Sequence, residues 1–474
     1  MYKSKVLSIF FLLCFATGIF SQTGYEIKVT IEGFEGKTAI LGFRRADQSF
    51  IVDTVEVKDG KCVFQGSEKL ATGIYLVLLP PNNDYFEFLL TPKEQRFSMK
   101  TVAPDYVKNL HFEGAEDNQI FYDYRLFLKG ELQKSDALQA VIGNEQDAAR
   151  KKKLEAQLQE LADVVETRQK ALIRQHPQTF TAELVAAFLE PKVPDPPLKP
   201  NGMVDETFQF RYYREHFFDH FDFTESGFVN TPYLKEKIDR YLDKLTVQSP
   251  DSVNASVDYI LGKAIKNRKV FEYTLPYLLN KYYRPRIVGM DAVFVHLAEK
   301  YYKSGVADWV KKDELKKILD DAYMIKGVLI GNQAPDVHVQ LYDYKTQSWT
   351  DKMINLYDVK SDFTVVFIWK PGCSHCRKAT DEMKEFYAKY KEKGVEIFGI
   401  TTARYRDLDK AVEEIKFKKP TWITTADPYM KARALQKYYA TTLPKIYLLD
   451  KDKTIIASRV AVSQLGEIID EIRG

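Results

Sequence analysis

The feature that most constrains this chain is a pair of cysteines, Cys373 and Cys376, placed between two contrasting patterns. Residues 363–369 before the pair are β-branched or aromatic without interruption, which predicts a buried strand. After the pair, apolar residues recur at helical spacing until Gly394 ends the pattern: Met383, Phe386, Tyr387 and Tyr390. A strand, a tight turn and a helix therefore place Cys373 at a helix N-terminus. Because thiols at this spacing can form a reversible disulfide, the sequence predicts a redox-active pair.

The first residues have the pattern of an export signal. Lys3 and Lys5 precede an apolar stretch over residues 6–16, and small and polar residues follow. This stretch is short for a transmembrane helix. We predict a signal peptide over residues 1–21, cleaved after Ser21, with an uncleaved, membrane-anchored form as the alternative.

The cysteine count argues against a scaffold of structural disulfides. Cys14 falls inside the signal peptide, and Leu13 before it is larger than the residue that lipoprotein signals prefer. The mature chain keeps one close pair, Cys373 and Cys376, and one odd cysteine, Cys62. Cys62 lies in a predicted strand, where a small buried side chain is the favoured interpretation and a resolving thiol the alternative.

Composition excludes several classes of partner. The 474 residues include 69 basic and 66 acidic side chains, and this near balance gives no reason to expect nucleic acid as a partner. The sequence has no glycine-rich phosphate loop and no metal-type cysteine cluster, so we expect no cofactor and no metal. His216 and His220 have a spacing that could hold a metal on one helix face, but no third ligand is marked. We favour surface or capping roles for both.

Patterning divides the chain into all-β, all-α and α/β parts. Alternating strands predict a β-sandwich-like domain over residues 22–112. The period then becomes helical, which predicts a helical region over 113–190, a proline-rich linker over 191–202 and an α-helical domain over 203–328. Strands and helices alternate from 329 to 474, which predicts an α/β domain.

Four local features add detail. Apolar residues from Leu154 to Leu172 follow alternating four- and three-residue steps, which favours an intrachain helix pair, with a dimer through residues 145–175 as the alternative. The Asp59-Gly60 dipeptide predicts a hairpin. We also expect a helix from Pro428 to Tyr439, and Ser463 as the cap of the last helix.

The α/β domain resembles the thioredoxin-fold domains of TlpA/ResA-like, redoxin-type thiol-disulfide oxidoreductases. The matching features are the opening Gly331-x-x-Ala334-Pro335-Asp336, Trp369 four residues before Cys373, the Cys-x-x-Cys pair, and Thr442-Leu443-Pro444 before a strand. The resemblance implies a thioredoxin fold with a cis Leu443-Pro444 bond beside the cysteines. It implies Cys373 and Cys376 as catalytic residues, supported by His375, Trp369, Leu443 and Pro444.

The upstream parts resemble domains of unknown function that are often fused to thioredoxin-like domains in Gram-negative envelope proteins. Together with the signal peptide, this implies a periplasmic protein. Its expected partners are protein thiols and disulfides of the envelope, and an unidentified partner that recycles the pair.

Three positions depart from the thioredoxin pattern. Phe367 replaces a buried aspartate, so the usual proton acceptor is missing or comes from elsewhere, such as an acid on the following helix. Gly372 replaces a common tryptophan. His375 resembles the DsbA-like Cys-x-His-Cys pattern, and an imidazolium at a helix N-terminus stabilises a thiolate. We therefore expect a reduction potential less negative than thioredoxin's, unless His375 only caps the helix.

Thiol-disulfide exchange is the favoured function, with Cys373 as the nucleophile and Cys376 as the resolving thiol. A redoxin-type peroxidase is one alternative, but its Pro-x-x-x-Thr/Ser-x-x-Cys setting is absent, since Lys370 stands three residues before Cys373. The other alternative is a binding or assembly protein with a non-catalytic thioredoxin-like domain.

Overall fold

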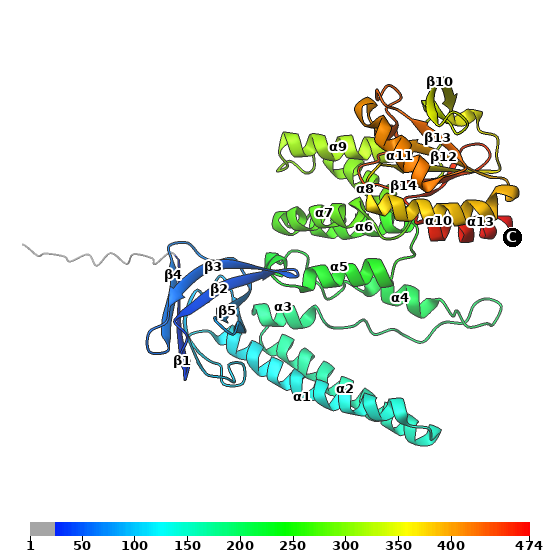
Figure 1. Ribbon diagram of the computed structural model, residues 1–474. Coiled ribbons are helices and arrows are strands. Elements are labelled where there is room, and N and C mark those ends of the chain that lie inside the picture. Colours follow the sequence, from blue (N-terminus) through cyan, green and yellow to red (C-terminus); the bar gives the residue numbers. More distant parts are fainter. Residues whose placement is uncertain (1–23) are drawn as a thin grey trace, which may run out of the picture. The chain divides into compact units, whose positions relative to one another are not determined.

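The computed structural model describes residues 24–474, so the predicted signal peptide and Cys14 lie outside the described residues. The chain divides into two compact units, with the boundary in the sequence between Ile238 and Asp239. The predicted multidomain class is confirmed: strands come first, then helices, then a mixed sheet (Figure 1). The helices expected as one domain over 203–328 are divided between the two units. Among residues 24–474, no helix is long and apolar enough to cross a membrane.

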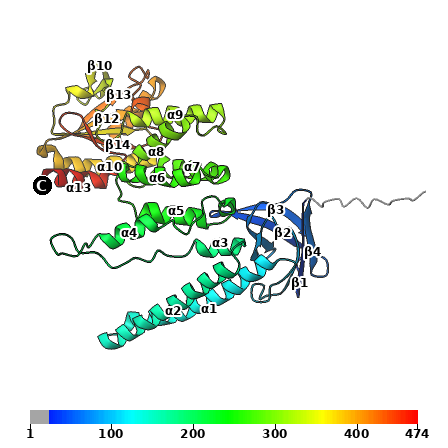
Figure 2. The ribbon, with the colours of Figure 1, turned by 180° about the vertical axis from the view of Figure 1, so that it is seen from behind.

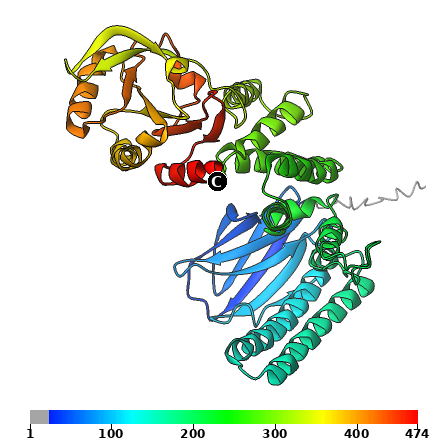
Figure 3. The ribbon, with the colours of Figure 1, turned by 90° about the vertical axis from the view of Figure 1, so that its right-hand side faces the viewer.

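The first unit begins with two four-stranded sheets, ordered β4-β1-β7-β8 and β3-β2-β5-β6, seen in blue in Figure 3. The strands are β1 (Tyr25–Glu32), β2 (Thr38–Arg45), β3 (Gln48–Glu56), β4 (Lys61–Gly66), β5 (Gly73–Leu79), β6 (Asp84–Leu90), β7 (Arg96–Val102) and β8 (His111–Glu113). Alternation in β1 buries Ile27, Val29 and Ile31. The tight turn predicted at Asp59-Gly60 is present, with backbone hydrogen bonds in both directions between Lys58 and Lys61, but the pairing stops there because β3 and β4 belong to different sheets.

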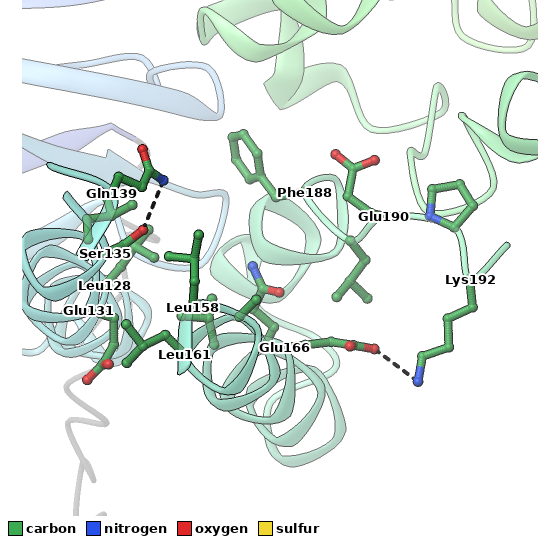
Figure 4. Close-up of a pocket in the computed structure, with 16 residues that line it drawn as sticks. Leu128, Glu131, Ser135, Gln139, Leu158, Leu161, Glu166, Phe188, Glu190 and Lys192 are labelled. Carbon is green, nitrogen blue, oxygen red and sulfur yellow. Dashed lines mark hydrogen bonds and ion pairs between the residues drawn. The ribbon is translucent and has the colours of Figure 1, made fainter. Parts of the chain in front are cut away.

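A helix pair follows the strands in this unit. Its helices are α1 (Glu116–Asn144) and α2 (Ala148–Gln175), followed by α3 (Phe180–Ala186). The favoured intrachain pairing is confirmed, because Tyr124 of α1 packs with Leu172 of α2 and with α3. Side chains of α1, α2 and residues 188–192 line a groove of about 560 Å³ (Figure 4).

The next helices overturn one expectation about histidines. They are α4 (Phe208–His216), η1 (Ser226–Asn230) and α5 (Tyr233–Lys244). Since α4 ends at His216, His220 lies in the following turn, and the predicted shared helix face is wrong. His216 Nδ1 instead lies 2.6 Å from the Asp219 carboxylate. Among the residues that the structure describes, no group of three or more potential ligands could hold a metal.

The second unit combines helices with a seven-stranded sheet. Its first helices are α6 (Pro250–Ala264), α7 (Arg268–Tyr283), α8 (Asp291–Leu297), η2 (Ala298–Tyr302) and α9 (Lys312–Lys326). A hydrogen bond and an ion pair join them to the sheet domain: the Tyr283 and Tyr439 hydroxyls lie 2.7 Å apart, and Arg459 lies 3.4 Å from Asp291. The helices and the thioredoxin-like domain therefore form one compact body.

The sheet has the order β10-β9-β13-β12-β11-β14-β15. Its elements are β9 (His338–Asp343), β10 (Ser348–Asn355), η3 (Leu356–Asp358), β11 (Phe363–Trp369), α10 (Ser374–Tyr390), η4 (Lys391–Lys393), β12 (Val395–Thr401), η5 (Tyr405–Asp407), α11 (Leu408–Lys418), β13 (Ile423–Ala426), α12 (Ala434–Lys437), β14 (Lys445–Leu449), β15 (Ile455–Ser458) and α13 (Val462–Arg473). Helices α10 and α13 lie side by side (Figures 1 and 2) and pack on β11 through a shared apolar core. The predicted central strand is confirmed as β11, in which every residue is buried.

Two helix predictions in this domain are wrong. In place of a helix over Pro428–Tyr439 the structure has only α12, because the Asp427 carboxylate accepts hydrogen bonds from the backbone N–H groups of Ala432 and Ala434 and holds a turn there. Ser463 does not cap α13, since that helix already begins at Val462.

Candidate functional site

The loop between β11 and α10 places the cysteine pair. Gly372 has a φ of 74°, a left-handed conformation that a side chain would strain, so the turn before Cys373 suits glycine. Cys373 is the N-cap of α10, and its Sγ accepts a hydrogen bond from the backbone N–H of Cys376 at 3.3 Å. The predicted helix N-terminal position of Cys373 is therefore confirmed. The unpaired N–H groups and the dipole of this helix end favour a negative charge on that sulfur.

The two thiols differ in exposure. Both are free in the structure; Cys373 is half-buried, whereas Cys376 is only 1% exposed. Burial raises the pKa of Cys376 to about 12, and the hydrogen bond with Cys373 acts in the same direction. The inner thiol therefore stays protonated at neutral pH, while the outer one can meet another molecule.

The proline loop lies at the same core as the pair. The Leu443-Pro444 peptide bond is cis, as the resemblance implied. Leu443 and Cys373 both pack against the core that contains Trp369 and Cys376. Lys445, directly after Pro444, pairs with Ile368 near the end of β11, so the proline loop lies at the same end of the sheet as Trp369 and the turn that carries the pair.

An acid near the pair comes from α11. Glu414 is nearly buried, and its carboxylate accepts two hydrogen bonds from Arg377 at 2.8 Å, from Nε and Nη2. Its Oε2 also lies 3.5 Å from the backbone nitrogen of Gly372. The hydrogen bonds from Arg377 lower the pKa of Glu414, so it is ionised at neutral pH. This charge helps to raise the pKa of Cys376.

Glu414 lies near Phe367, the residue that replaces the buried aspartate of thioredoxin. Together with Phe367 and Trp369 it lines a cavity of about 10 Å³, about enough for one water molecule. An acid on a helix was expected, but it stands on α11 and not on α10. Sequence alone could not select it, because Glu413 and other acids lie on the same helix.

His375 is exposed on the first turn of α10 and does not cap the helix, because Cys373 is the N-cap. Its ring makes no hydrogen bond within residues 24–474. The alternative in which His375 serves only as a cap is therefore wrong. The ring is available to a molecule that approaches Cys373.

Family models of known proteins match three parts of the chain. The sequence model of the AhpC/TSA family matches residues 330–458. Two domains of unknown function match upstream, DUF4369 over residues 25–121 and DUF5106 over residues 164–324.

Curated relatives carry the functional comparison. The chain is 30% identical over 147 residues to thiol-disulfide oxidoreductase ResA of Bacillus thuringiensis subsp. konkukian, a match covering 31% of this chain and 70% of that protein. It is also 30% identical over 129 residues to ResA of Bacillus anthracis, covering 27% of this chain and 67% of that protein. The chain belongs to the ResA-like thiol-disulfide oxidoreductases.

Solved structures similar to this oxidoreductase include two from Bacteroides. A thioredoxin-like protein from Bacteroides caccae is 18% identical with a TM-score of 0.46, covering 59% of this chain and 99% of that chain. A thiol:disulfide interchange protein from Bacteroides sp. is 26% identical with a TM-score of 0.27, covering 31% of this chain and 93% of that chain.

The difference between the two thiols of this oxidoreductase can be measured by alkylation. With limiting iodoacetamide at pH 8, we expect Cys373 to react at least about tenfold faster than Cys376, because only a thiolate attacks and Cys376 is protonated and buried. Reaction at Cys376 should rise with pH toward its pKa. Peptide mass spectrometry checks this.

Cys62 is an internal control in the same sample. It is buried in β4, and burial raises its pKa to about 11, so it should also stay unmodified at pH 8. The favoured interpretation of Cys62 as a small buried side chain is confirmed. Equal alkylation of Cys373 and Cys376 would contradict the predicted division of roles.

Proposed function

We propose that the protein exchanges disulfides with protein substrates of the cell envelope through the Cys373-Ser374-His375-Cys376 pair. The observation that carries this proposal is the arrangement of the pair: a half-buried Cys373 at the N-terminus of α10, with Cys376 buried beneath it. An outer nucleophile and an inner resolving thiol are what two-step exchange requires.

The first step forms a mixed disulfide. The Cys373 thiolate attacks one sulfur of a client disulfide, the client S–S bond breaks, and the other client sulfur leaves as a thiolate that takes up a proton. The exposed His375 ring, two residues after Cys373, is accessible to the client during this step. Backbone groups next to Pro444 would hold the client as an added strand.

The second step releases the client. Cys376 loses its proton and attacks Cys373 Sγ, the mixed disulfide breaks, and the client's second sulfur leaves and is protonated. The client gains two electrons, and the protein is left with a Cys373–Cys376 disulfide. A separate thiol partner reduces this disulfide, and the reverse sequence oxidises a client.

Location and assembly are part of the proposal. The export-signal pattern supports action in the periplasm, on protein thiols and disulfides there. A dimer through residues 145–175 stays a prediction.

Redox titration against glutathione tests the function. Because the helix N-terminus and His375 favour the thiolate, the disulfide should form reversibly with a reduction potential less negative than thioredoxin's. The measurement is the oxidised fraction at each glutathione ratio, read by thiol trapping. A pair that never exchanges with glutathione would contradict the function; a potential at or below thioredoxin's would contradict only the oxidising bias.

Peroxide consumption by the same reduced sample tests the peroxidase alternative. Neither cysteine has the peroxidatic sequence setting, so we expect slow consumption beside rapid exchange. Consumption faster than exchange would favour the peroxidase.

A further inference from the structure

A cavity of about 240 Å³ lies beside the proline loop, within the second unit. Pro444, Lys445 and Arg459 line it from the sheet domain, and Arg284 lines it from the loop after α7. The segment upstream of the thioredoxin-like domain therefore contributes to a surface next to the proline loop.

The cavity lies at the end of the sheet where β11 leads to the cysteine pair. Lys445 pairs with Ile368 of β11, the residue before the strand ends at Trp369. Leu443, which precedes Pro444, packs against the same core as Cys373. Because Pro444 lines the cavity, a client strand held at Pro444 would lie beside it.

Positive charge dominates the cavity. Lys445 is 7% exposed, and its ammonium group has no ion-pair or hydrogen-bond partner among residues 24–474. Arg284 likewise has no ion pair within those residues, and Arg459 has one, with Asp291 at 3.4 Å. Burial, and then the charge of Arg459, lower the pKa of Lys445 to about 8. The Asp291 carboxylate acts in the opposite direction and offsets part of this effect. Three cations and no acidic side chain line the cavity, so it attracts an entering anion.

We propose that this cavity binds a carboxylate side chain of the client protein, next to the client's reacting cysteine. The inference rests on the proposed function and adds a substrate class to it: clients with aspartate or glutamate beside the cysteine. Its size supports a single side chain, since cavities for whole small molecules are usually about 300–1,000 Å³. Arg284, Lys445 and Arg459 supply the complementary charge.

Paired peptides test this preference with the full-length protein. Two disulfide-linked reporter peptides differ only in glutamate or glutamine beside the cysteine, and their reduction is followed in a single turnover at low salt. We expect the glutamate peptide to react roughly three- to tenfold faster, because complementary charge speeds encounter and holds the complex. Arg284→Gln should remove most of this ratio.

Arg286→Gln is the matched control, because Arg286 is exposed, lies two residues further on and does not line the cavity. It should keep the wild-type ratio. Equal rates for the two peptides would overturn the carboxylate site while leaving the proposed function intact. No reaction with either peptide would instead overturn the proposed function.

A binding measurement makes the test independent of exchange. The same peptides with serine in place of cysteine are titrated into the protein by fluorescence anisotropy, and the glutamate form should bind several-fold more tightly to the wild type than to Arg284→Gln. Inorganic phosphate at matched ionic strength is the competing probe. If phosphate binds at this site and the glutamate peptide shows no preference, the site is for a small anion and the peptide assignment fails.

Discussion

Replacing Cys373 with serine is expected to reduce disulfide exchange to the uncatalysed background. Cys373 is the half-buried thiol at the N-terminus of α10, and no other described cysteine is placed to substitute, because Cys376 and Cys62 are buried and have raised pKa values. Cys376→Ser should instead keep the first step and lose the second. A mixed disulfide with the client should accumulate, visible as a gel shift that a reductant reverses.

The control is Cys62→Ser, which removes a thiol of β4 and should change neither step. The opposite pattern, with trapping by Cys373→Ser and background rates for Cys376→Ser, would exchange the roles of the two thiols. Trapped partners identified from cell envelopes would name the client and show the direction of exchange.

Replacing Glu414 with glutamine is expected to destabilise the protein and to change the resolving step. The variant loses the charge that pairs with Arg377 at 2.8 Å, and because the Arg377 side chain is half exposed to water, the loss costs at most about 1 kcal/mol at pH 7. It also removes a negative charge that raises the pKa of Cys376. The pKa of Cys376 should fall, so the pH profile for release of the mixed disulfide should move to lower pH.

The sign of the stability effect follows from the pKa of Glu414, which is lowered in the folded protein. Its stabilisation is present above the pKa of an unfolded glutamate, about 4.3, and is lost as the pH falls through the lower, folded value. The difference between wild type and variant in urea unfolding should therefore shrink in acid.

Glu413→Gln is the matched control, since Glu413 is the exposed neighbour on α11 and should leave both measurements unchanged. A stability loss with an unmoved pH profile would show that Glu414 acts only on folding and not on the reactivity of Cys376.

Local patterns predicted much of the catalytic domain. The strand over residues 363–369 could be predicted from its unbroken run of β-branched and aromatic residues. The helix after the pair could be predicted from apolar residues at helical spacing. The failures arose where a side chain overrides the pattern. Asp427 binds two backbone N–H groups and holds a turn where helical spacing predicted a helix.

From the sequence alone came the redox pair, its strand–helix setting, the thioredoxin-like class and the proline loop, since all of them are encoded in short contiguous motifs. The surroundings of the pair required the folded chain. Glu414 and Arg377 are 37 residues apart, and Arg284 and Lys445 come from different domains, so no spacing marks either set. Charged side chains interact when they lie close in space. The fold brings α11 close to α10, and the loop after α7 close to the start of β14, which makes these residues partners.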